Sequence, residues 1–190
     1  MQPRLSSGFT LVEVVVALAL LVVVTVGVVR LFAVALNAGR AARDRTLAVA
    51  LATGKIEQLR SLEWRFELDA SAVLTPHTDT SSNLSLESVS PGGPGLAESP
   101  AGTLETNMPP YVDYLDRHGR WAGTGASPPG NASYVRRWAV HRLPADPDRV
   151  VVLQVFVATV QRERARRGSV PHAWNGEDVL LATLMMRRVR

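Results

Sequence analysis

Residues 9–29 read FTLVEVVVALALLVVVTVGVV, and this stretch determines how the rest of the chain is interpreted. It contains one charged residue, Glu13, and no proline. At about 1.5 Å per residue, a helix of this length spans roughly 30 Å, the thickness of the hydrocarbon core of a bilayer. A helix that packs on a soluble core carries polar residues along one side, whereas this one is apolar on all sides. The stretch therefore predicts a membrane-spanning helix.

Three hypotheses compete for this N-terminus. A secretory signal peptide would be cut after the small residues at 17–19, but Glu13 interrupts the apolar region and the chain stays apolar beyond that cut. A plain single-pass anchor leaves Glu13 without a role, although a carboxylate inside the membrane costs about 2–3 kcal/mol or more and usually marks function. The third hypothesis explains Gly8, Phe9 and Glu13 together.

The string Gly8-Phe9-Thr10-Leu11-Val12-Glu13, followed by the apolar run, resembles the type IV prepilin motif. This motif occurs in type IV pilins, minor pilins and the pseudopilins of type II secretion. The resemblance implies that a membrane peptidase cuts after Gly8 and that Phe9, the new N-terminus, is N-methylated. It also implies that Glu13 takes part in subunit assembly through a salt bridge to a neighbouring N-terminus.

Physical chemistry supports these roles independently. Gly8 has no side chain, so its backbone can lie flat in a protease cleft. Glu13 follows Phe9 by four residues, which is about one helical turn. Cleavage creates a positive amine beside apolar surface, and such a charge needs a partner. Glu13 can pair with the Phe9 amine of a neighbouring subunit or with that of its own chain.

The resemblance also implies partners and a location. The partners are other pilin or pseudopilin subunits, the prepilin peptidase and methyltransferase, an inner-membrane assembly platform and membrane lipid. The leader, residues 1–8, lies in the cytoplasm and the head in the periplasm before the subunit enters a pilus or pseudopilus filament. The distribution of basic residues alone would predict the opposite orientation, because cytoplasmic segments normally carry the excess of Lys and Arg. Here Arg4 precedes the apolar run, while four arginines follow it, at positions 30, 40, 43 and 45.

The helical pattern continues through residues 30–64, which contain no proline. An amphipathic stripe recurs at spacings of three to five residues, formed by Leu47, Leu51, Ile56, Leu59 and Leu62. One helix from Phe9 to about Leu62 would be roughly 80 Å long. Glycines at 27, 39 and 54 are positions where it is expected to bend or unwind locally.

The remainder divides into a loop region and a sheet. Residues 65–133 are rich in Ser, Pro and Gly, with a long loop over 70–108 and short strands expected near 84–89 and within 112–121. Residues 134–190 form the predicted antiparallel head, with strands over 134–143, 150–160 and 179–186. A long N-terminal helix packed on a small antiparallel sheet is an α+β architecture, and it is also the pilin-like fold that the resemblance implies.

Composition and motifs exclude several other functions. The chain has 21 basic and 17 acidic residues, a net charge of +4, and no cysteine. The absence of cysteine rules out disulfides and thiolate metal sites, and the scattered arginines do not indicate nucleic-acid binding. No pair of histidines has helical metal-ligand spacing, and a solvated turn explains His118 beside Asp113 and Asp116 better than a metal loop does. We therefore expect no enzymatic activity, no metal and no cofactor.

The arginines at 162, 164, 166 and 167 are expected to form a solvated basic loop tip.

Within the family, the start GFTLVEVVVALALL, residues 54–59 and the strand from Tyr134 to Trp138 are most similar to the PilV type of minor pilin. The I-type pseudopilin of type II secretion is the close alternative. A membrane-anchored binding module that never enters a filament is the competing class.

Overall fold

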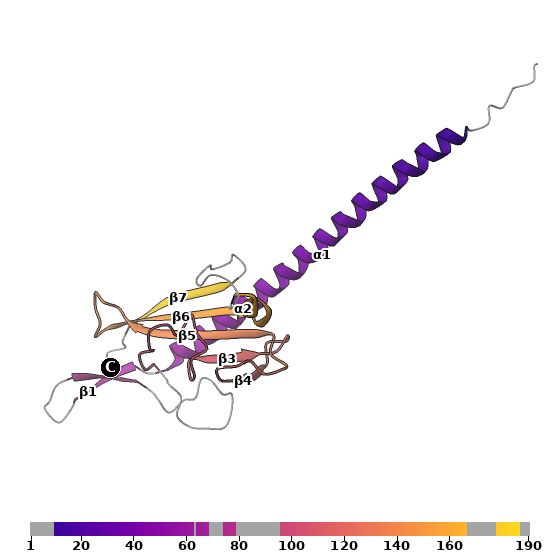
Figure 1. Cartoon of the computed structure of the whole chain (residues 1–190). Coiled ribbons are helices and arrows are strands. Elements are labelled where there is room, and N and C mark those ends of the chain that lie inside the picture. Colours follow the sequence, from indigo (N-terminus) through magenta and orange to yellow (C-terminus); the bar gives the residue numbers. More distant parts are fainter. Residues whose placement is uncertain (1–9, 63, 69–73, 79–95, 167–177, 187–190) are drawn as a thin grey trace, which may run out of the picture. The chain divides into compact units, whose positions relative to one another are not determined.

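Two helices and seven strands make up the described part of the chain (Figure 1). The computed structural model describes residues 10–62, 64–68, 74–78, 96–166 and 178–186 of the 190-residue chain. The chain divides into two units, residues 1–43 and residues 44–190. We call them the N-terminal unit and the head. Their elements, in order, are α1 (Leu11–Ser61), β1 (Trp64–Leu68), β2 (Leu74–Thr78), β3 (Val112–Leu115), β4 (Trp121–Thr124), β5 (Tyr134–Arg142), β6 (Val150–Thr159), α2 (Val160–Arg166) and β7 (Val179–Met186).

Helix α1 is one continuous element of 51 residues. It contains no proline, and Ala and Leu are frequent along it, although valine, a weaker helix former, is its most common residue. The helix passes through Gly27, Gly39 and Gly54, so the expected weak points do not end it. Its last turn is closed by the Ser61 hydroxyl, which donates to the carbonyl of Gln58 at 2.7 Å. The predicted helix over residues 9–62 is confirmed from Leu11 to Ser61.

A five-stranded antiparallel sheet forms the centre of the head, in the order β4-β3-β5-β6-β7. Strand β6 is mostly Val and Leu, and it is paired on both sides, with Trp138 of β5 opposite Val155 and Leu181 of β7 opposite the same residue. Such a run is expected where both faces of a strand are largely covered. The predicted strands are present as β5, β6 and β7, and β7 has the predicted bounds.

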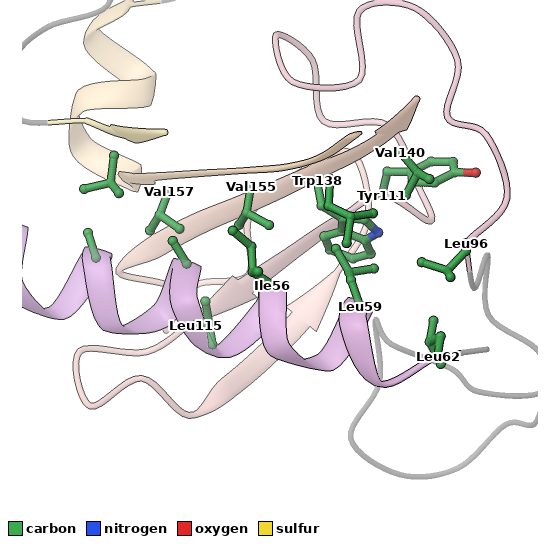
Figure 2. Close-up of a cluster of buried hydrophobic side chains, with 14 of the residues drawn as sticks. Ile56, Leu59, Leu62, Leu96, Tyr111, Leu115, Trp138, Val140, Val155 and Val157 are labelled. Carbon is green, nitrogen blue, oxygen red and sulfur yellow. The ribbon is translucent and has the colours of Figure 1, made fainter. Parts of the chain in front are cut away.

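The main core lies between the head part of α1 and one face of this sheet (Figure 2). Leu59 and Ala52 are fully buried, and Trp138 fills the centre of the sheet face opposite them. Alanine at positions 48 and 52 leaves room for the helix to approach the sheet closely. The predicted stripe is confirmed at its C-terminal end by the buried side chains of Ile56, Leu59 and Leu62.

A glycine allows the β3–β4 turn to lie against the helix. Gly119 has a φ of +78°, and a Cβ there would lie 3.1 Å from the side chain of Leu51. A side chain would be disfavoured both by this backbone conformation and by the close approach. The turn therefore needs glycine at this position.

The opposite face of the sheet carries a smaller apolar cluster. Phe156 is fully buried there with Val112, Tyr114 and Val135. Helix α2 covers part of this face through Val160. The sheet is thus covered on both sides at this end, which explains why β5 is buried along nearly its whole length.

The loop region contains more strand than the sequence indicated. Strands β1 and β2 form a separate antiparallel hairpin, and β2 lies inside the stretch expected to be loop. Its register pairs Pro76 with Phe66, although proline is disfavoured inside a strand because it has no backbone N–H to donate. The single strand expected within 112–121 is instead β3, a turn and the start of β4. The strand expected at 84–89 lies outside the described residues.

The basic loop tip is a second correction. Residues 160–166 form helix α2, in which Val160 and Glu163 are buried. Arg166 is only partly exposed and forms an ion pair with Asp178 at the start of the last strand. The expected loop is wrong here because residues 160–166 are helical and the buried carboxylate of Glu163 pairs with Arg166. Arg164 is exposed, as predicted, and Arg167 lies outside the described residues.

Candidate functional site

The candidate site begins at the first turn of α1. Thr10 precedes the helix, and its carbonyl and hydroxyl oxygens accept from the backbone N–H of Glu13, at 3.1 and 3.3 Å. A threonine at the N-cap followed three residues later by glutamate is the sequence pattern of a capping box. The helix start is therefore encoded locally, two residues after Phe9.

Beyond this turn, the N-terminal unit has an exposed apolar surface. Leu11 is 80% exposed and Leu36 is 62% exposed. Between them lies an apolar series of which each large side chain is exposed by 45% or more, and it includes Val12, Val14, Val15, Val16, Leu18, Leu20, Leu21, Val22, Val23, Val24, Val26, Val28, Val29, Leu31, Phe32 and Val34. A helix that is apolar all round in a folded protein is surrounded by lipid or by other chains.

The polar groups along this surface are few. The hydroxyl of Thr25 donates to the carbonyl of Leu21 at 2.7 Å, so the helix itself satisfies it. Glu13 lies in the first turn, where a negative charge is stabilised by the helix dipole. Arg30 follows the first apolar stretch. Among the described residues, α1 is the helix that is long and apolar enough to cross a membrane, and none of its most apolar window is buried.

A family model for the prokaryotic N-terminal methylation motif matches residues 3–29. The chain carries a prepilin-type N-terminus. The match spans Gly8, Phe9 and Glu13, and it supports a type IV pilin-like protein that is anchored in the inner membrane by its N-terminal helix. The motif implies assembly with other pilin subunits and processing by prepilin peptidase. No curated protein and no solved structure matches the chain.

The methylation motif covers a small part of the chain, and the structure shows part of it. Gly8 and Phe9 lie outside the described residues, whereas Glu13 lies in the first turn of α1. The match identifies the motif without testing the role of each residue.

In the head, the structure reveals a buried charge cluster that the sequence analysis missed. The guanidinium of Arg136 donates to both carboxylate oxygens of Asp113, at 2.9 and 2.7 Å, and to the carbonyl of Leu51 at 3.2 Å. The Nζ atom of Lys55 lies 3.6 Å from Asp113 and 3.6 Å from the ring centroid of Trp138. These contacts join α1 to β3 and β5, so the cluster fixes the head part of the helix on the sheet.

Burial changes the protonation of this lysine. Loss of water around Lys55 lowers its pKa from 10.5 to about 7, and this effect outweighs the attraction of Asp113. Arg136 binds both carboxylate oxygens of Asp113 at 2.9 and 2.7 Å, whereas Lys55 lies 3.6 Å from the same carboxylate. Arg136 is therefore the closer of these two cationic partners of Asp113. The one sequence feature that pointed here is that Lys55 is the only lysine among 21 basic residues.

A second cluster fixes α2 and the loop before β3 on the other face of the sheet. Fully buried Arg137 donates to the Oδ1 atom of Asn107 at 2.9 and 2.6 Å and to the carbonyl of Leu104 at 3.0 Å. It also forms an ion pair with Glu163. Arg137 and Trp138 are neighbours in β5 and lie on opposite faces of the sheet. Arg137 is nevertheless fully buried, because α2 covers its face.

The remaining candidates of the sequence analysis form no further site. Asp116 accepts from the backbone N–H groups of His118 and Arg120 at 2.7 and 2.9 Å, and these bonds lower the pKa of its carboxyl. The turn expected for this segment is therefore confirmed for Asp116 and His118, whereas the expectation is wrong for Asp113, which is buried in β3. Across the part of the chain that the structure describes, no three metal-ligating side chains come together.

Proposed function

We propose that this chain is a minor pilin or pseudopilin, most similar to the PilV type of a type IV pilus. It is inserted in the inner membrane, cleaved after Gly8, N-methylated at Phe9 and incorporated into a filament. The observation that carries the proposal is the methylation motif at the start of an uninterrupted helix with an exposed apolar surface. That surface offers a large apolar area for packing, which supports a structural role.

Glu13 has the central role in this proposal. Its carboxylate lies in the first turn of α1, next to apolar side chains of which Val12 is 70% exposed. A charge in such surroundings is stable only with a partner of opposite sign. The amine created at Phe9 by cleavage provides that partner, either in a neighbouring subunit or in the same chain.

The capped helix start supports the proposed cleavage. Helix α1 begins at Leu11, so the bond after Gly8 precedes the first helical residue by two positions. Proteases bind extended backbone, and glycine allows close approach to the chain. Thr10 thus separates a segment for processing from a segment for packing.

The first test is the intact mass of the protein isolated from its own membrane. We expect a mass that lacks residues 1–8 and carries one added methyl group. An uncleaved chain would favour a plain anchor. A cut after Ala19 would make the head a released domain, and either result would contradict the proposal.

The second test separates assembly from insertion. The Glu13→Ala variant should insert and be cleaved but fail to enter filaments, because the new amine loses its partner. Glu13→Asp, which keeps the charge, is the matched control and should retain partial incorporation. Normal incorporation of Glu13→Ala would remove the role proposed for Glu13 and favour an anchored binding module. The I-type pseudopilin alternative is distinguished by which filament the wild-type chain enters.

A further inference from the structure

Thr10 meets both criteria of a helix N-cap residue. Its carbonyl accepts from the backbone N–H of Val14 at 3.3 Å, which is the first i to i+4 hydrogen bond of α1. Its hydroxyl accepts from the backbone N–H of Glu13 at 3.3 Å, and the same nitrogen lies 3.1 Å from the Thr10 carbonyl oxygen. The backbone of Thr10 thus begins the helix, and its side chain satisfies a donor of the first turn.

No residue that follows Thr10 closely can replace this cap. Residues 11–24 read LVEVVVALALLVVV, so Glu13 is the only polar residue before Thr25. The side chains of Leu11 and Val12 are 80% and 70% exposed and contain no acceptor. In the proposed function this turn lies at the membrane border, where little water is present to satisfy the first N–H groups of a helix. The hydroxyl of Thr10 therefore has a strong influence on where α1 begins.

The next capping side chains upstream are the hydroxyls of Ser6 and Ser7. A helix capped at either serine would include Gly8 and Phe9 in its first turn, with helical and not extended backbone. A helix capped at Thr10 begins at Leu11, two residues after Phe9, as the structure shows. The alternative caps therefore differ in whether the bond after Gly8 lies inside or outside the helix.

We propose that Thr10 is a positioning residue for the cleavage, because its hydroxyl holds the start of α1 at Leu11 and keeps the bond after Gly8 available to the peptidase as non-helical chain. The inference rests on the cleavage in the proposed function and names a residue that controls it. Hydrolysis adds one water across the Gly8–Phe9 amide and leaves a carboxylate on Gly8 and an amine on Phe9. Thr10 takes no part in that step and acts through the helix boundary alone.

A second threonine on the same helix provides a matched control. The hydroxyl of Thr25 donates to the carbonyl of Leu21 at 2.7 Å, inside the continuous helix. Because this hydroxyl donates to a carbonyl, it caps no N–H group. Both threonines are exposed. Replacing each by valine, which keeps the branched shape, removes a hydroxyl at the helix boundary in one case and within the helix in the other.

The test is the initial rate at which prepilin peptidase removes residues 1–8 from the full-length chain in membranes, followed by mass. Thr10→Val should be cleaved about 2- to 5-fold more slowly than wild type, because loss of an N-cap shifts the equilibrium of the helix boundary about 5-fold. Thr10→Ser and Thr10→Asn both retain a capping side chain and should be cleaved within about 2-fold of the wild-type rate. Thr25→Val should match wild type.

Three results would overturn the inference and leave the proposed function intact. Cleavage of Thr10→Val at the wild-type rate would show that the cap has no influence on processing. Slow cleavage of Thr10→Asn beside normal cleavage of Thr10→Ser would show that the peptidase recognises the hydroxyl itself. Equal slowing in Thr25→Val would assign the effect to loss of a hydroxyl anywhere on the helix. A wild-type chain that is not cleaved would contradict the proposed function and remove the inference with it.

Discussion

The two ends of α1 belong to one helix but have opposite surroundings. Leu20 is 62% exposed, whereas Leu59 is fully buried against the sheet. Both are leucines in regular helix, so the difference comes from the neighbours and not from local conformation. The N-terminal half is stable as a helix only where lipid or other helices surround it, while the head part is stabilised by its own core. The exposed apolar surface of α1 is thus separate from the surface that packs in the core of the head.

The largest expected effect lies in the buried charge cluster of the head. Asp113→Asn should destabilise the head by about 3–5 kcal/mol, because the buried cations Arg136 and Lys55 lose the carboxylate they face. Thermal unfolding of the detergent-solubilised full chain, followed by near-UV circular dichroism, measures this. The matched control is Glu57→Gln, which breaks the exposed pair of Glu57 with Arg60 and should change stability by less than about 1 kcal/mol.

A matched pair of leucine truncations tests the comparison itself. Leu59→Ala should destabilise the head by about 2–5 kcal/mol through loss of buried area and the cavity left behind. Leu20→Ala, on the same helix, should leave head stability unchanged within about 0.5 kcal/mol. The same unfolding measurement serves both variants. Equal effects would show that the two halves of α1 do not differ as described.

Stability of the head should rise with pH above neutrality. Between pH 7 and pH 10.5 the unfolded chain holds a proton at Lys55 that the folded chain has released, so unfolding takes up a proton and raising the pH favours the folded state. We expect a gain of about 2 kcal/mol from pH 7 to pH 9. The variant Lys55→Met should lack this gain, and urea titrations at the two pH values measure it. A rise of the same size in Lys55→Met would assign it to other groups.

The smallest effect concerns the bond at the start of the head part of α1. The hydroxyl of Tyr134 donates to Asp44 at 3.0 Å, and burial together with this bond raises the pKa of the tyrosine to about 12. Tyr134→Phe removes the donor but leaves the ring and should cost about 1 kcal/mol. Spectrophotometric titration should show loss of the tyrosine with the highest pKa. Its persistence in the variant would mean that another residue has that value.

The sequence predicted the structure well for elements that the local residue pattern alone specifies. Strand β7 has the predicted bounds, and β6 ends one residue earlier than expected, because short apolar runs between turn signals favour strands. The helix was also predictable, since proline is absent and Thr10 with Glu13 forms a cap. The prepilin motif was predicted from residues 8–13, which lie within residues 3–29 that the family model matches.

What escaped prediction depends on residues far apart in the chain. Helix α2 forms where a loop was expected because buried Glu163 pairs with Arg137, 26 positions away. The charge cluster likewise joins Asp113 to Arg136 across 23 positions. Hairpin β1–β2 contains Pro76, which local propensity disfavours. Local composition carries no information about such pairings.

The single buried lysine has a consequence for chemical labelling. An acylating reagent needs an accessible neutral amine, and the side chain of Lys55 is fully enclosed in the folded head. Since the other basic residues are arginine and histidine, the folded protein offers such reagents the amine of its N-terminus alone. Acylation at the terminus would then report its processing, and acylation at residue 55 would report opening of the head. One reagent would therefore report both N-terminal processing and opening of the head in the same experiment.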